Sequence, residues 1–203
     1  MEYEKIEKVV KERLSEKRFL HSVMVAKKAE ELAIKYGENP EVAKIIGVAH
    51  DIAKEMTEEE YFDYVEKNNI EIDDVERENI SLLHAKVGAD ICKKKFGFNE
   101  QMQNAVKYHT TGNVDMDNMA KIIYLADKIE DTRVYDGVEE AREKTNISLD
   151  KGMIFMLARG MKKCELENRI FHSASKELYE KLLEKMVKWI FNDNSRLVLN
   201  LVV

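Results

Sequence analysis

An ionisable pair, His50-Asp51, interrupts the apolar segment GVAHDIAKEM, which otherwise has the pattern of a buried helix. Burying an imidazole and a carboxylate is costly unless each group finds a polar partner. Neighbouring side chains on a helix point in directions about 100° apart, so these two groups are not expected to pair with each other. A group outside this segment must therefore bind both.

Four histidines and two aspartates share this kind of setting. The histidines lie within or at the end of four different expected helices, and they are His21, His50, His84 and His109. The aspartates are Asp51 and Asp127, the latter in the apolar segment IIYLADKIED. A single histidine on an apolar face is most often a core residue, but six ionisable groups would need six separate buried partners. One divalent metal centre satisfies them together, because neutral imidazole and carboxylate are both good ligands for such an ion.

The order His…His-Asp…Asp resembles the signature of the HD superfamily of metal-dependent phosphohydrolases. More specifically, five motifs over residues 17–135 are similar to its bacterial YqeK-like branch, the symmetrical bis(5'-nucleosyl)-tetraphosphatases. These motifs are RFLHSVMVA, AHDIAKEM, LLHAKVGA, YHTTG and KIIYLADKIEDTR. The resemblance implies an all-helical HD-domain bundle that hydrolyses diadenosine tetraphosphate to two ADP, with iron as the metal, as one or two ions.

The resemblance also implies a ligand set. The first ion would be held by His21, His50, Asp51 and Asp127. A second ion, bridged by Asp51 or solvent, would be held by His84 and His109; alternatively, these two histidines would contact a substrate phosphate. A divalent metal lowers the pKa of water towards neutrality and polarises phosphoryl oxygens, which suits phosphoanhydride hydrolysis.

Three cationic residues near the motifs are candidates to bind phosphate. Lys54 follows His50 by four residues, which on a helix places it on the same face, and we assign it a catalytic role with Asp51. A solvated lysine near a helix end is the alternative. Arg133, six residues after Asp127, suits bidentate binding of phosphate. Arg18, three residues before His21, is a weaker candidate for the same role.

Further polar residues flank the motifs. Thr110 and Thr111 follow His109 where a helix ends, and they offer hydroxyl or backbone N–H groups to phosphate. Glu130 and Asp131 are interpreted as a solvated or structural pair rather than as a base. His172 falls between two expected helices, where the family has a His-Pro-rich loop that reaches the nucleotide. Ser173 replaces the proline here, so substrate binding by His172 competes with a helix start capped by a serine.

Helical periodicity and capping signals account for most of the chain, and the signals include a capping box of Thr57 with Glu60 and an N-cap at Asn99. They predict helices over 2–16, 17–36, from Asn39 past Asp51, 57–67, 76–96, 99–109, 116–131, 136–144, 148–166 and 175–191. No segment of comparable length alternates like a strand, so we expect an all-α fold. No linker rich in Pro, Gly or Ser divides the chain, so residues 1–203 are predicted to form one HD-type domain. Its motif core is about 17–135 and its helical C-terminal part about 136–203.

Composition limits the partners and the compartment. A net charge of −6 provides no electrostatic footprint for nucleic acid. The expected partner, a dinucleoside polyphosphate, is the one that the family resemblance implies. The segment MEYEKIEKVV resembles neither a signal peptide nor a transit peptide, and no apolar run is long enough to span a membrane. Cys92 and Cys164 lie outside any CxxC pair and are typical of free thiols, so we expect a cytoplasmic protein. The apolar ending RLVLNLVV either packs on the body or pairs with a second chain in a homodimer.

Three other functions stay open at this stage. The chain could be another HD-type phosphohydrolase, acting on nucleoside monophosphates or guanosine alarmones. It could be a di-iron oxygenase on the same scaffold, although Lys54 and Arg133 favour a phosphorylated substrate. It could be a nucleotide sensor without activity, although a pure sensor does not need the six-residue ligand set.

Overall fold

The structure is a computed structural model that describes residues 2–199, with side chains described for residues 2–189. Over these residues it contains eleven α-helices, one short 3-10 helix (η1) and no strand, which confirms the expected all-α fold. None of the described helices is both long and apolar enough to cross a membrane. In chain order the elements are α1 (Tyr3–Arg13), α2 (Glu16–Tyr36), α3 (Pro40–Ala49), α4 (Glu58–Lys67), α5 (Asp74–Glu78), η1 (Ile80–Leu82), α6 (Leu83–Phe96), α7 (Glu100–Tyr108), α8 (Asn118–Ile129), α9 (Val138–Ile147), α10 (Leu149–Leu166) and α11 (Ser173–Leu199).

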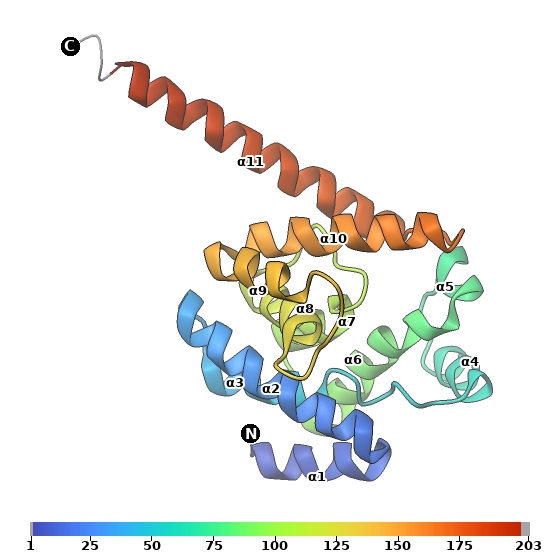
Figure 1. Ribbon diagram of the computed structural model, residues 1–203. Coiled ribbons are helices and arrows are strands. Elements are labelled where there is room, and N and C mark those ends of the chain that lie inside the picture. The colour runs from blue at the N-terminus through green and yellow to red at the C-terminus, as the bar shows by residue number, and fades with distance from the viewer. Residues whose placement is uncertain (1, 200–203) are drawn as a thin grey trace.

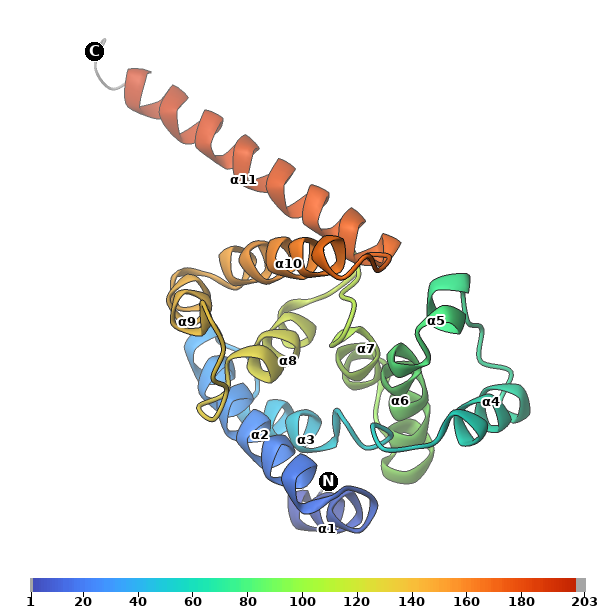
Figure 2. The same ribbon diagram turned by 45° about the vertical axis from the view of Figure 1, so that its right-hand side comes forward.

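Helix α8 lies at the centre of the body and contacts α2, α3, α7, α9 and α10. Figure 2 shows α2 and α3 on one side of α8 and α10 on the other. Nine of its twelve residues are buried, as expected for a helix that is apolar on nearly all sides. Asp127 is one of them, so the fold buries a carboxylate in its central helix.

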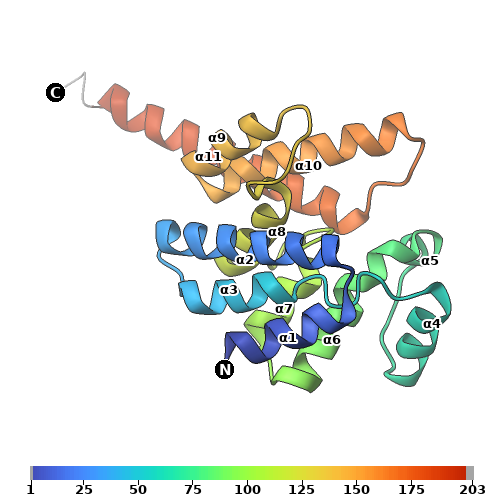
Figure 3. The same cartoon turned by 60° about the horizontal axis from the view of Figure 1, so that its bottom comes forward.

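The outer elements frame this centre. Helix α11 begins against α10 and extends away from the body towards the C-terminus (Figure 1). Helices α4 and α5 form a corner beside α6, away from α9 (Figure 3). The predicted capping box of Thr57 and Glu60 is present at the start of α4, and Asn99 caps α7 as expected. The apolar ending 196–203 lies outside the residues whose side chains are described, so its packing is not part of this structure.

The prediction that the third helix continues past Asp51 is wrong. Helix α3 ends at Ala49, and residues 50–55 form successive turns in which Lys54 N–H donates to Asp51 O at 2.8 Å. The Gly47 carbonyl, which would accept the Asp51 N–H in a longer helix, faces His50 Nδ1 at 2.7 Å. The turns that follow are tied to other elements by side-chain hydrogen bonds. Arg13 Nε donates to Ile52 O at 3.3 Å, and the Tyr61 hydroxyl donates to Ala53 O at 2.5 Å.

The expected helix 76–96 is also interrupted. It divides into α5, η1 and α6 around Asn79, whose backbone is not helical at φ −125° and ψ 75°. The Ser81 hydroxyl donates to the Asn79 side chain at 2.6 Å, a local bond of the kind that competes with helix formation. As a result, α6 starts at Leu83 and His84 lies in its first turn, facing the other metal-ligand candidates.

Helices α2 and α3 touch through their backbones at Gly47. A Cβ atom added there would lie 2.6 Å from Ala26 Cα, closer than any side chain tolerates. This close contact sets the spacing between the helix that carries His21 and the helix that ends before His50. The two imidazole centroids are 5.4 Å apart.

We expect Gly47→Ala to destabilise the protein by about 1–3 kcal/mol, because the new methyl group must push the two backbones apart. Gly88→Ala is a matched control, since a Cβ there would meet its nearest atoms at an ordinary 3.6 Å. Helix propensity should make that control neutral or slightly stabilising. Urea unfolding of both variants tests this, and equal midpoints would show that the contact is not tight.

Candidate metal centre

Four imidazoles and two carboxylates from five parts of the fold meet in one cluster. His21 comes from α2, His50 and Asp51 from the end of α3, His84 from α6, His109 from the end of α7, and Asp127 from α8. All but His21 are buried, and that side chain is only 11 % exposed. The rings form a row, with centroids 5.4 Å apart for the first pair, 5.0 Å for His50 and His109, and 4.9 Å for His84 and His109. The structure therefore brings together all six residues that the sequence selected as ligands.

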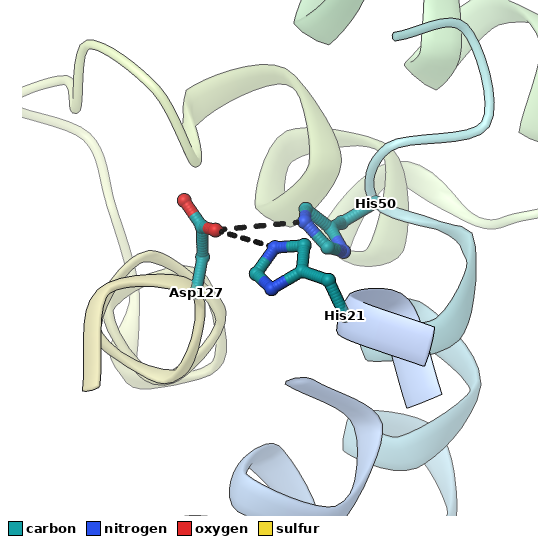
Figure 4. Close-up of side chains that lie close together, drawn as sticks. All are labelled: His21, His50 and Asp127. Carbon is teal, nitrogen blue, oxygen red and sulfur yellow. Dashed lines mark hydrogen bonds and ion pairs between the residues drawn. The ribbon is translucent and has the colours of Figure 1, made fainter. Parts of the chain in front are cut away.

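One half of the cluster is formed by His21, His50 and Asp127 (Figure 4). Asp127 Oδ1 lies 3.0 Å from His21 Nε2 and 3.8 Å from His50 Nε2. Asp51 Oδ2 closes this half, at 3.4 Å from His50 Nε2 and 4.0 Å from His21 Nε2. Ligand atoms that each lie about 2.1 Å from a common ion are separated by distances of this size. The geometry suits a single divalent ion.

The other half lies on the opposite oxygen of Asp51. Asp51 Oδ1 is 3.3 Å from His84 Nε2 and 3.6 Å from His109 Nε2. These two nitrogens are themselves only 3.0 Å apart. The carboxylate of Asp51 thus stands between two groups of imidazoles, with one oxygen facing each group.

Backbone carbonyls determine the tautomer of three imidazoles. Each Nδ1 faces the carbonyl oxygen three residues earlier, at Gly47 for His50, Ser81 for His84 and Val106 for His109. A carbonyl only accepts, so Nδ1 carries the proton and Nε2 presents a lone pair to the cluster. His50 Nε2 is buried with no hydrogen-bond partner among the described residues. Two facing lone pairs on His84 and His109 repel unless a cation lies between them, so this donor set fits a metal.

The pKa directions of the clustered groups also favour a metal site. Burial lowers the pKa of His84, and burial with the charges of neighbouring imidazoles lowers the pKa of His109 to about 4, so both are neutral at pH 7. Burial opposes ionisation of Asp51 and Asp127, but His50 beside Asp51 and Lys128 beside Asp127 keep the pKa of each carboxyl well below its usual value. Burial opposes protonation of His50, but the charge of Asp51 beside it raises the pKa of this imidazole. The cluster therefore combines two carboxylates, whose charge a divalent cation would balance, with neutral imidazoles at His84 and His109.

Glu130 is a functional candidate that sequence reasoning left aside. Its side chain is 1 % exposed and Oε1 lies 3.2 Å from His21 Nδ1, while its other oxygen accepts the Thr132 backbone N–H at 2.6 Å. A carboxylate on the far nitrogen of a metal-binding histidine orients the ring and increases its basicity. Asp131, its partner in the expected pair, is exposed and pairs with Lys28 at 2.7 Å. The sequence did contain a signal for this role, because Glu130 follows Asp127 by three residues and residues at that spacing lie on the same side of a helix.

Four cations surround the two carboxylates. Arg18 Nη1 is 3.0 Å from Asp51 Oδ2, and Arg133 Nη2 is 2.7 Å from Asp127 Oδ1. Lys128, which the sequence analysis did not single out, places Nζ 2.6 Å from Asp127 Oδ2. The fourth is Lys54.

The location of Lys54 corrects the sequence prediction. Because α3 ends at Ala49, Lys54 does not share a helical face with His50 and lies in the following turn. Its Nζ is 3.3 Å from His84 Nδ1 and 3.4 Å from His84 Nε2. Burial lowers the pKa of Lys54, against the nearby charge of Asp51. The residue reaches the cluster from the His84 side.

A cavity of about 800 Å³ adjoins the cluster. Thr110 and Lys128 line it, and Thr110 Oγ1 is 3.2 Å from both His84 Nε2 and His109 Nε2. Thr111 also lines it, and its carbonyl accepts from Ser175 Oγ at 2.6 Å. His172 lies on the cavity wall outside the cluster, with Nε2 3.0 Å from Asp73 Oδ2. The structure thus separates His172 from the metal-ligand candidates and places it beside the cavity.

Comparison with known proteins bears on this site. A family model described as "HD domain" matches residues 18–132. The chain is 34% identical over 146 residues to the symmetrical bis(5'-nucleosyl)-tetraphosphatase of Bacillus subtilis (strain 168), covering 71% of this chain and 78% of that protein. It is 30% identical over 176 residues to the protein of the same name from Halalkalibacterium halodurans, covering 86% of this chain and 94% of that protein.

A solved structure is similar over nearly the whole chain. It is the crystal structure of a predicted HD superfamily hydrolase involved in NAD metabolism from Clostridium acetobutylicum, with a TM-score of 0.87 and 33% sequence identity. The match covers 91% of this chain and 98% of that one. The helical arrangement described here is therefore shared with a solved structure.

We expect Glu130→Gln to weaken metal binding about 10- to 100-fold, because the neutral amide no longer polarises His21. Asp131→Asn, at the adjacent exposed position, is the control and should bind as the wild type does. Titration of the metal-stripped proteins with a transition metal measures both affinities. A wild type that binds no metal, or a Glu130→Gln variant with unchanged affinity, would contradict the assignment.

Proposed function

The chain belongs to the HD domain family, and from this premise we propose that it is a metal-dependent phosphohydrolase that cleaves diadenosine tetraphosphate symmetrically to two ADP. The observation that supports this most is the cluster around Asp51, a two-sided metal-ligand set with four cations beside it. The names of the relatives supply the substrate class. Iron is the metal that we propose, as one or two ions.

We assign His21, His50, Asp51 and Asp127 to one ion. The second oxygen of Asp51, with His84 and His109, would hold another ion or face a substrate phosphate. A divalent ion supplies Lewis-acid polarisation of phosphoryl oxygens and a lower pKa for water when it is bound there. The protein's part is to hold the ligand atoms in place, through the backbone carbonyls behind three histidines and through Glu130 behind His21.

The surrounding cations bind and orient the polyphosphate in this proposal. Arg18 and Arg133 present guanidinium groups, whose fork of donors matches phosphate oxygens. Lys54 adds a point charge near His84, and Thr110 adds a hydroxyl that donates to a phosphate oxygen. A tetraphosphate is strongly anionic and the chain has a net charge of −6, so binding depends on this local positive field.

Thr111 and His172 are proposed to contact the substrate from the cavity wall. The remaining expectations also stay proposals: a single domain over residues 1–203, no nucleic-acid partner, a cytoplasmic location and a homodimer. Packing of α10 on the central α8 supports the single domain, since it joins the C-terminal part to the helix that carries Asp127. The acidic net charge supports the absence of a nucleic-acid partner.

The products of diadenosine tetraphosphate hydrolysis test the proposal. With ferrous iron added, we expect ADP alone, because symmetrical cleavage breaks the central anhydride bond. Chromatography of the reaction mixture separates the outcomes. Equal amounts of ATP and AMP would overturn symmetrical cleavage, and oxygen consumption without hydrolysis would favour the oxygenase alternative.

Lys54→Met should lower turnover about 100- to 1000-fold, because it removes a preorganised charge near the reacting phosphate while keeping much of the apolar stem. Metal content and melting temperature should stay close to those of the wild type. Lys95→Met, at an exposed site in the last turn of α6, is the control. Wild-type turnover in Lys54→Met would show that this lysine has no role in the chemistry.

A further inference from the structure

The cavity beside the metal centre extends well beyond it, to helix α10 and the segment 167–172. Its wall combines two kinds of side chain. Aromatic rings come from Tyr124, Tyr135, Phe171 and His172. Five cations line it against two acids: Lys128, Arg159, Lys162, Lys163 and Arg169, with Asp136 and Glu167. Aromatic surface suits a nucleobase and clustered cations suit phosphate, so the lining matches a nucleotide.

Arg159 is the most organised of these cations. Its guanidinium carbon lies 5.5 Å from the Tyr135 ring centroid and 5.7 Å from that of Phe155. One Nη donates to the Asp136 carbonyl, and a Cβ at Gly137 would fall 2.5 Å from the other Nη. No ion pair among the described side chains includes Arg159. Its charge is held in place and left without a carboxylate partner in that part of the chain.

Lys162 and Lys163 extend the charge of Arg159 along α10. They follow it by three and four residues, so all three side chains share one face of the helix, and all three line the cavity. Both lysines are exposed, whereas Arg159 is partly buried. This face forms a graded cationic wall that leads away from Lys128 and the cluster.

We propose that this cavity binds one nucleoside diphosphate half of the substrate, with Arg159 binding its phosphates and the rings of Tyr135 and Phe171 packing on its base. This inference rests on the proposed function and goes beyond it by naming the residues that hold this nucleotide. A volume of about 800 Å³ is large enough for a complete nucleoside diphosphate, because ligand pockets of 300–1,000 Å³ hold molecules of that class.

The reaction places one nucleotide on each side of the scissile bond. One water adds across the central P–O–P bond: its oxygen bonds to one inner phosphorus, and the bridging oxygen departs with the other. The products are two nucleoside diphosphates and a released proton.

The test compares Arg159→Met with wild type and with Lys151→Met, an exposed residue of α10 that does not line the cavity. For diadenosine tetraphosphate we expect KM to rise about 10-fold or more in Arg159→Met, since a charge-assisted contact to phosphate is lost, with kcat changed much less. Calorimetric titration with ADP should give a dissociation constant about 10-fold higher for Arg159→Met than for the wild type, since the same contact is lost. Lys151→Met should match the wild type in both measurements.

Arg159 packs on two rings, so Arg159→Met could destabilise the fold. A second variant keeps the inference testable in that case. Lys162→Gln/Lys163→Gln changes only exposed side chains, and its KM should rise about 3- to 10-fold at low salt and converge on the wild-type value at high salt. If the wild type makes ADP and neither variant changes KM, the inference is overturned and the proposed function stands. If the wild type does not hydrolyse the substrate, the proposed function fails. The ADP titration then decides alone, and equal ADP affinity in wild type and Arg159→Met overturns the inference.

Discussion

The buried carboxylate of Asp51 is the constraint on which the arrangement of the centre depends. One oxygen faces His50 and the other faces His84, so two groups of imidazoles from different helices are organised around a single side chain. A carboxylate in this position is tolerated only where positive charge or hydrogen-bond donors surround it. The helices that deliver those partners must therefore end, turn and pack at particular places. The early end of α3 at Ala49 and the break before α6 are two of these adjustments.

A second layer of contacts determines how the ligand atoms are presented. Three imidazoles donate Nδ1–H to a carbonyl three residues earlier, so their lone pairs point inwards before any ion arrives. His21 lies in the second turn of α2, where backbone carbonyls are already used by the helix, and Glu130 takes over this function. The difference explains why one acidic residue outside the ligand set is buried and its neighbour Asp131 is not. Position in the helix decides which kind of group orients the ring.

Much of this organisation was predictable from the sequence. Apolar periodicity and capping residues predicted most helices, because these signals are local: Thr57 with Glu60 and Asn99 are found where expected. The six ligand candidates were identified because ionisable residues in apolar segments need a shared partner. The failed predictions concern long-range contacts: the turns that follow α3 are held by hydrogen bonds from Arg13 and Tyr61, which no local pattern reveals. Lys128 was overlooked, and Glu130 was interpreted as part of a solvated or structural pair, because charged residues near a helix end are usually solvated.

The metal-ligand candidates and the cations at the far side of the cavity come from different parts of the chain. The last ligand candidate along the chain is Asp127 in α8, whereas Arg159 and its neighbours belong to α10, which begins at Leu149. Helix α8 connects them, because it carries Asp127 and packs against α10. Substitutions on α10 can therefore alter which molecule is accepted without disturbing the groups that hold the ion. This modularity would allow related enzymes to diverge in substrate preference by sequence drift in one helix, while the reaction chemistry is inherited intact.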